Sequence, residues 1–307
     1  MIWLARWGRS RATCLFAYLF LTGFGDAFAV TLYAINGSNA HLIAFSSDTP
    51  STLSTDVALS GVTGYTLKAV SFRPSTGELY GFAIPQLFGA ARLVKIDVTT
   101  GGATTVGDGP TVSDSASTQY GMAFDPVTDQ IRIVSGSSNF RINPGTGTLI
   151  ADDGALAYAA SDPRTGQPVL TGKLAYTNAF SGPVTEATAH VVETGSSGFG
   201  AIDVVATLGS PSGTPISATS GTLFSVADLS WHSTSNQGGF VVEPRSRTGY
   251  AVFRQSGVSS LYSVNLGTGA VQLLGPVGTG SNSILGLALA PVSAVHPCLD
   301  PDGDGKV

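Results

Sequence analysis

The sequence carries little charge and few basic residues. Lys, Arg, Asp and Glu together make up 11% of the 307 residues, and the net charge at pH 7 is −5. Beyond the first eleven positions the basic residues are scattered along the chain and form no basic stripe. Binding to phosphates requires clustered Lys and Arg. Nucleic acid is therefore excluded as an expected partner.

A hydrophobic run long enough to cross a membrane is also missing. The apolar stretch 12–24 is shorter than the roughly 20 residues that a bilayer span needs. It follows Arg6, Arg9 and Arg11 and precedes Ala27-Phe28-Ala29, which is the layout of a secretory signal with a small-x-small cleavage site. We expect cleavage before Val30 and a secreted protein, extracellular, periplasmic or on the cell surface, with no remaining membrane span. An uncleaved membrane anchor is the alternative.

Cysteine is almost absent, and the expected cleavage removes one of the two. Cys14 lies in the signal segment, so Cys298 would be the single cysteine of the mature chain. No internal disulfide is then expected, although export leads to an oxidising space. A partner further downstream is the favoured explanation for Cys298, and an intermolecular bond is the alternative. The mature chain would keep 12 basic and 19 acidic residues, a net charge of −7.

Helical periodicity is lacking, and two kinds of turn alternate along the chain instead. The first has the form apolar-x-Pro-x-Thr-Gly and occurs at 72–77 and, with Asp129 at the Gly position, at 124–129. A longer version leads from Glu243-Pro244 to Thr248-Gly249. The second has the form apolar-Asp/Asn-x-x-Thr-Gly and occurs at 96–101, 142–147 and 264–269. Gly supplies positive φ, and Asp or Asn side chains bond to nearby backbone groups, so both patterns predict hairpin turns.

The segments between these turns are short and rich in β-formers, which predicts an all-β fold. Strand, Pro-type turn, strand, loop, strand, Thr-Gly turn and strand form a four-stranded antiparallel meander, as in a propeller blade. We place such units near 64–109, 119–154, 170–225 and 238–278, with 209–221 as a surface loop. The strand at 284–290 joins 31–35 and 41–45 in a fifth, closing blade. The prediction is a five-bladed β-propeller over 30–291, with a six-bladed ring or a β-sandwich as alternatives.

Several short stretches resemble one known bacterial family. They are 130–135, 139–144, Asp153-Gly154, 175–178 and 261–269. On these residues the chain resembles domain-of-unknown-function family 4394 over about residues 30–291, and it departs from the family pattern after Asn178. The resemblance implies a secreted, propeller-like domain and leaves its activity open.

The last sixteen residues, 292–307, are expected to be a linker followed by the start of a calcium loop. Asp300, Asp302 and Asp304 occupy ligand positions 1, 3 and 5, Gly305 stands at the sharp turn, and Lys306 offers its backbone carbonyl. The pattern is similar to the start of a dockerin or another EF-hand-like calcium repeat. The sequence stops before positions 9 and 12, so we expect at most loose Ca²⁺ binding here. An acidic, solvated tail is the alternative.

Two arginines and an asparagine form a candidate binding cluster in the second unit. Arg132, Arg141 and Asn143 lie close together in sequence, and a fork of guanidinium donors suits a carboxylate or a sugar acid. By strand alternation Arg132 lies on the face opposite Ile131 and Ile133. The competing interpretation is structural pairing, with the partners drawn from the carboxylates Asp125, Asp129 and Asp152.

No catalytic motif stands out. The four histidines lie far apart without zinc-site spacing, and no Gly-x-Ser-x-Gly elbow is present. A carboxylate pair for glycoside hydrolysis has candidates in Asp152, Asp153, Glu186 and Glu243, although turn hydrogen bonds also explain such residues. Aromatic candidates for stacking against a sugar, or equally for core packing, are Trp231, Tyr176 and Tyr158.

Two functions remain open on the sequence alone. The first is a monomeric, non-enzymatic extracellular domain that binds or scaffolds an unknown protein or glycan and is attached to a calcium-dependent module. The second is a secreted carbohydrate-active enzyme, a glycoside hydrolase or lyase, that uses the central cavity of the propeller. Facing carboxylates with an aromatic wall in that cavity would favour the enzyme, and a cavity plugged by small apolar residues would favour the binding domain.

Overall fold

The computed structural model describes residues 29–292, apart from 39, 87–88, 113–118, 195–202, 230–234 and 236. The described part is built of strands with two short 3₁₀ turns, η1 (Pro211–Gly213) and η2 (Ala218–Ser220), so the all-β prediction is confirmed. None of its helices has the length and apolar content needed to traverse a bilayer. The predicted signal segment up to residue 28, Cys298 and the predicted calcium loop lie outside the described residues.

The strands form five antiparallel units of four. The first unit is β4 (Tyr65–Phe72), β5 (Leu79–Pro85), β6 (Ala90–Ile96) and β7 (Ala103–Thr111). The second is β8 (Gly121–Phe124), β9 (Ile131–Ser135), β10 (Ser138–Ile142) and β11 (Leu149–Asp152). The third is β13 (Thr171–Tyr176), β14 (Ala189–Glu193), β15 (Val204–Leu208) and β16 (Thr222–Asp228).

The remaining two units share one eight-stranded sheet. The fourth unit is β17 (Gly238–Val242), β18 (Thr248–Gln255), β19 (Val258–Asn265) and β20 (Val271–Pro276). The closing unit is β21 (Ile284–Leu289), β1 (Thr31–Asn36), β2 (His41–Ser46) and β3 (Leu53–Ala58). The antiparallel pairing of β1 with β21 confirms that the strands from the two ends of the domain share a sheet. A single parallel pair, Gly238 with Leu285, connects β17 to β21.

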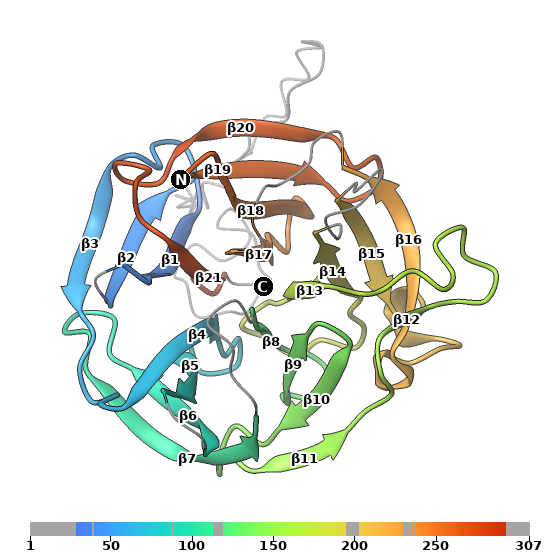
Figure 1. Cartoon of the computed structure of the whole chain (residues 1–307), viewed down its shortest axis with the longest axis horizontal. Helices are drawn as coiled ribbons and strands as arrows, with labels where there is room; N and C mark the ends of the chain where they lie inside the picture. The colour runs from blue at the N-terminus through green and yellow to red at the C-terminus, as the bar shows by residue number, and fades with distance from the viewer. Residues whose placement is uncertain are drawn as a thin grey trace, which may run out of the picture.

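The five units follow one another around a centre, which gives a propeller-like arrangement (Figure 1). In each unit the first strand lies nearest the centre, and the last strand lies at the rim, as β7, β11 and β20 do. The buried apolar residues divide into five clusters, and each cluster fills the boundary between two consecutive units. The boundary of the closing unit with the first unit is among them, through Ile35, Leu42, Leu67 and Val70. Alternation along the strands therefore buries both faces of each sheet.

The Pro-type turns share one backbone conformation. Counted from the residue before the proline, the fifth residue of each turn has a positive φ and donates its N–H to the carbonyl of the first. The pairs are Gly77 to Arg73, Asp129 to Asp125 and Arg247 to Glu243, all at 2.8 Å. The prediction of a longer third turn, ending at Thr248-Gly249, is wrong. That turn ends at Arg247, which occupies the place that glycine takes in the first unit. The Glu243 N–H donates to the Thr248 carbonyl, as the Arg73 N–H donates to the Glu78 carbonyl in the first unit.

The Thr-Gly turns meet the rim strand of the preceding unit through their glycines. Gly101 and Gly269 have φ of +73° and +68°, and an added Cβ would lie 2.3 Å from the carbonyl oxygens of Ala58 and Asp228. Gly147 approaches Gly107 in the same way. We call Gly101, Gly147 and Gly269 the outer-turn glycines. Glycine is required at these positions for two reasons, the left-handed backbone and the close approach of the neighbouring strand.

The third unit departs from the expected pattern. Its 209–221 loop lies at the surface, as expected, but its Gly221 packs against the carbonyl of Gly154 and so acts as this unit's outer-turn glycine. A further two-residue strand, β12 (Ala157–Tyr158), pairs with β16 in parallel. Neither contact is local in sequence.

Candidate functional site

Arg132 and Arg141 come together as predicted, but their donors are already used within the protein. The two residues are direct cross-strand neighbours on β9 and β10. Arg132 Nη1 and Arg141 Nε each lie 2.8 Å from Asp153 Oδ2, and Arg141 Nη2 lies 2.9 Å from Asp153 Oδ1. A third donor of Arg141, Nη1, reaches Gln130. The predicted role of these arginines as free carboxylate binders is therefore not supported by the geometry.

The predicted structural partners Asp125, Asp129 and Asp152 are also wrong. The Asp153 N–H donates to the Asn139 carbonyl, which places the Asp153 side chain on the face shared by Asn139 and Arg141. Asp152 precedes it and falls on the opposite face. Asp125 instead accepts from the Val127 N–H in its own turn, and Asp129 pairs with Arg73 of the first unit.

Arg132 is a structural residue that connects the second and third units. Only 2% of its surface is exposed. Its side chain lies on the face of β9 opposite Ile131 and Ile133, as predicted. Its Nε donates to the Tyr176 hydroxyl at 2.8 Å, and burial raises the pKa of Tyr176 to about 12. Asn143, the third predicted member, does not join this network. Its side chain accepts the Gly145 N–H within the 143–147 turn.

Two of the candidate carboxylates, Asp153 and Glu243, have structural partners. Asp153 is held by the two arginines, and Glu243 accepts the Ser246 N–H inside its turn. Tyr158 donates to the buried Glu193 and so packs as a structural residue, while Trp231 lies outside the described residues. Among the described residues no group of three or more His, Cys, Asp or Glu suits a metal ion.

The innermost strands approach one another closely at the centre of the propeller-like arrangement. The innermost strands carry Gly121, Gly172, Gly239 and Gly286 where they pass one another. An added Cβ on Gly239 would lie 2.3 Å from Leu287 N, and one on Gly286 would lie 3.0 Å from Ala69 Cα. The described residues leave a space of about 10 Å³ on the axis and one of about 50 Å³ beside it, the latter lined mainly by apolar residues. Ligand pockets usually need about 300–1,000 Å³.

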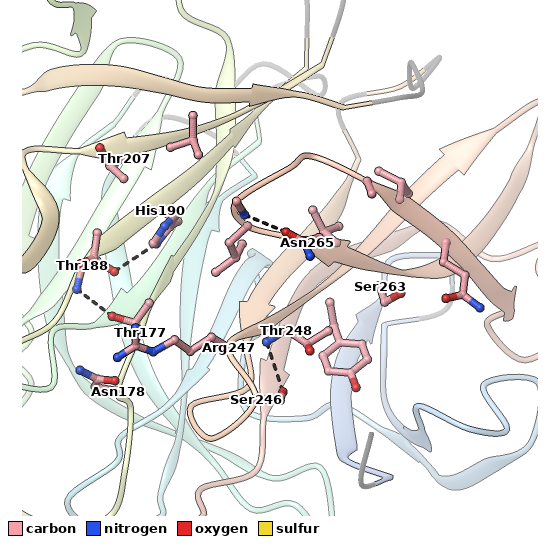
Figure 2. A pocket seen from close by; sticks show the side chains of 18 of the residues that line it. Thr177, Asn178, Thr188, His190, Thr207, Ser246, Arg247, Thr248, Ser263 and Asn265 are labelled. Atoms are coloured by element: carbon pink, nitrogen blue, oxygen red, sulfur yellow. Dashed lines mark hydrogen bonds between the residues drawn. The ribbon is translucent and has the colours of Figure 1, made fainter. Parts of the chain in front are cut away.

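A much larger space, the polar hollow, lies between the third and fourth units and extends to the closing unit. Its volume is about 1180 Å³. Hydroxyl and amide side chains dominate its lining (Figure 2): Thr177, Asn178, Thr188, Thr207, Ser246, Thr248, Ser263 and Asn265. These groups come from the third and fourth units, and each of them can both donate and accept hydrogen bonds.

Strand alternation builds the wall of the hollow on the third unit. On β14 Ala189 and Val191 enter the core cluster shared with the second unit, so His190 and the preceding Thr188 face the hollow. The Thr188 N–H donates to the Thr177 hydroxyl at 2.9 Å, which holds the two hydroxyl residues together. Burial lowers the pKa of His190 to about 4. At neutral pH this wall therefore presents a neutral imidazole.

Comparison with known families decides the relationship of the chain. The profile of the family described as "Domain of unknown function (DUF4394)" matches residues 41–288. The chain belongs to the DUF4394 family. No curated protein sequence matches it.

Solved structures resemble this DUF4394 domain only distantly. A nidogen/laminin complex chain has 12% identity and a TM-score of 0.48, covering 85% of this chain and 98% of that one. A protein of unknown function from Bacteroides caccae has 10% identity and a TM-score of 0.43, with coverages of 85% and 99%. The PQQ-bound aldose sugar dehydrogenase from Streptomyces coelicolor has 15% identity and a TM-score of 0.47, with coverages of 84% and 91%. At these values the likenesses imply nothing about function.

Three charged residues line the polar hollow of the DUF4394 domain. Asp48 lies at the closing unit, and Glu186 accepts the Ser212 hydroxyl at 3.0 Å on the third unit. Arg247 lines it from the fourth unit. The sequence singled out Glu186 only as a candidate hydrolytic carboxylate, and it gave no role to Asp48 or Arg247. A signal for Arg247 was nevertheless present, because aligning Glu243-Pro244 with Arg73-Pro74 places Arg247 where Gly77 stands.

Proposed function

We propose that this chain is a secreted, non-enzymatic binding domain that holds an extracellular glycan in the polar hollow. The single observation that carries the proposal is the contrast between a hollow of about 1180 Å³ and an axis that leaves about 10 Å³. Sugar hydroxyls both donate and accept hydrogen bonds, as the Ser, Thr and Asn side chains of the lining do. The apolar side chains of Val226, Leu266 and Leu274 offer surface for the faces of sugar rings.

The alternative of a carbohydrate-active enzyme working in the central cavity has less support. The space that the described innermost strands leave on the axis is about 10 Å³, far below the roughly 300 Å³ of a usual ligand pocket. The candidate carboxylates Asp153 and Glu243 are occupied by arginines and by a turn, away from that axis. A binding role needs neither group.

We further propose that the five units form a closed five-bladed propeller. The five inter-unit core clusters support this. Closure removes free sheet edges at the meeting point of the two ends. Deleting residues 281–291, which include β21, is then expected to give insoluble or protease-sensitive protein. A soluble truncated protein that unfolds cooperatively would contradict closure.

The export signal and the calcium module complete the proposal. Cleavage before Val30 is tested by N-terminal sequencing of the protein recovered from the culture medium or the periplasm. A calcium-dependent module that begins at Asp300 is tested by calorimetric Ca²⁺ titration of the protein expressed from the entire gene, with Asp302→Asn as the variant. Failure of the export test would overturn the extracellular location, and failure of the calcium test would overturn the calcium module. Glycan binding in the hollow is tested separately.

The binding site is tested by filling the hollow. Val226 lines it and is 40% exposed, so Val226→Trp is expected to abolish retention on a glycan array. Val258 is similarly exposed at 45% and lies outside the lining, so Val258→Trp is the matched control and is expected to bind as the wild type does. Thermal unfolding of both variants checks that they fold. A wild-type protein that retains no glycan, or equal binding by the two variants, would overturn the proposal.

A further inference from the structure

Arg247 occupies a backbone position that is unfavourable for arginine. It is the fifth residue of a Pro-type turn and has φ of +57°. The same place is taken by Gly77 in the first unit, with φ of +71°, and by Asp129 in the second, with φ of +57°. Glycine adopts this region without steric cost, whereas a long side chain does not. Strain of this kind in a turn beside a cavity points to a function for the side chain.

The two non-glycine residues at this position differ in their partners. The single N–H of Arg73 Nε is shared between the two carboxylate oxygens of Asp129, at 3.0 and 3.1 Å. Asp129 also accepts hydrogen bonds from Arg73 Nη2 and from the Ser75 hydroxyl. Arg247 makes its backbone bond to Glu243, but its guanidinium has no hydrogen bond or ion pair with any other described residue. Its side chain is exposed and points toward Thr177 and Asn178 across the hollow (Figure 2).

The other charges around the hollow limit what Arg247 can hold. Glu186 on the third unit is bonded to Ser212, and Asp48 lies on the closing unit. Both repel an anion, and the neutral His190 offers it no positive charge. The hollow is therefore suited to a ligand with one isolated negative charge near Arg247 and hydroxyl groups elsewhere.

We propose that the ligand is an acidic glycan whose sugar carboxylate is bound by Arg247. The planar guanidinium presents two parallel N–H donors to a carboxylate, and the neighbouring hydroxyl and amide side chains contact the rest of the sugar. This inference rests on the proposed function, because it assigns the chemistry of the ligand in the same hollow. It makes Arg247 the residue that determines specificity.

The test uses a panel of uronic-acid oligosaccharides, their neutral methyl esters and sulfated oligosaccharides, followed by calorimetry with the acid that binds best. Wild type is expected to prefer the acid over its ester. Arg247→Gly is expected to weaken binding of the acid about 10- to 100-fold, the loss of one charged hydrogen-bonded pair, and to leave ester binding unchanged. Arg247→Lys is expected to recover part of the loss.

The matched control removes a positive charge elsewhere. Arg92 pairs with Asp108 on the first unit and lies outside the hollow, so Arg92→Gln is expected to bind the acid as the wild type does. Equal binding of acid and ester, or no effect of Arg247→Gly, would overturn this inference and leave the binding domain standing. Preference for the sulfated panel would overturn the carboxylate assignment. Retention of no glycan would remove the proposed function as well.

Discussion

The third unit meets its two neighbours in different ways. Toward the second unit, two arginines share the buried Asp153, and Tyr176 and Asn139 complete the network. Toward the fourth unit, the boundary holds the polar hollow, and Arg247 extends into it. Both boundaries also have an apolar cluster, with Val191 in one and Val192 in the other.

The two flanks of the third unit share their structural features and differ in their polar residues. Apolar clusters and outer-turn glycines are present on both flanks, so they belong to the assembly of the ring. The polar layer above them differs. Where arginine is matched by a buried carboxylate it stabilises the boundary, and where it is unmatched and solvated it is available to a ligand.

The largest expected effect comes from breaking the filled flank. Asp153→Ala would leave Arg132, 2% exposed, without its carboxylate, and should lower the free energy of unfolding by about 3–5 kcal/mol. Asp108→Ala removes a carboxylate that is 60% exposed and pairs with Arg92, and should cost less than about 1 kcal/mol. Urea denaturation measures both. Similar losses in the two variants would mean that the Asp153 network contributes no more than a surface pair.

The second prediction concerns what the flanks share. Gly221 faces the Gly154 carbonyl on one flank, and Gly269 faces the Asp228 carbonyl on the other, with added Cβ distances of 2.2 and 2.3 Å. Gly221→Ala and Gly269→Ala should each cost about 2–3 kcal/mol through strain and displaced backbone. Gly77→Ala has the same left-handed backbone in open space and should cost about 1 kcal/mol. If all three alanine variants were equally stable, the close approach would have no energetic role.

A feature of the fold could be predicted from the sequence where the residues that specify it are close together in the chain. The Pro-type and Thr-Gly turns mark their own hairpins, because Gly, Pro and Asx residues act on the nearest backbone groups. The first, second and fourth meanders followed from them. The contact of Gly221 with Gly154 and the pairing of β12 with β16 join distant segments, and no local pattern announces them.

The site was harder to predict for the same reason. The proximity of Arg132 and Arg141 was correct, since strand pairing brings them together, but Asp153 became visible as their partner only through the register of β10 with the residue after β11. Asn143 was assigned by sequence proximity although its turn role was also recognised. The polar hollow draws on residues from three units, such as Thr177, Asn265 and Asp48, and no local sequence pattern brings them together.

The third prediction tests the open flank by pH. Burial lowers the pKa of His190 to about 4, below its ordinary value, so between pH 6.5 and 4 the unfolded chain binds a proton that the folded chain does not. The stability contributed by the neutral imidazole is present above pH 6.5 and is lost as the pH falls through this window. Between pH 7 and 4 the free energy of unfolding of wild type should therefore fall by about 2 kcal/mol more than that of His190→Gln. This figure is the energy of the full pKa shift, reduced for partial solvation of the imidazole. Parallel curves for the two proteins in urea titrations would show that His190 is solvated.

The smallest effect should come from Arg247, and its sign is the informative part. Replacing a left-handed non-glycine residue with glycine relieves about 1–2 kcal/mol of steric cost, and the greater freedom of glycine in the unfolded chain returns about 0.5–1 kcal/mol. Arg247→Gly should therefore raise the free energy of unfolding by about 0.5–1 kcal/mol, because no ion pair is lost with it.

Asp129→Gly is the matched variant at the same turn position of the second unit. The substitution relieves the same steric cost but removes the ion pair with Arg73, which contributes up to about 1 kcal/mol at the surface. The free energy of unfolding should therefore change by about zero. Chemical denaturation of the two variants beside wild type measures the difference. A loss of stability in Arg247→Gly would mean that the arginine is held by the protein itself, and it would then be a structural residue like Arg132.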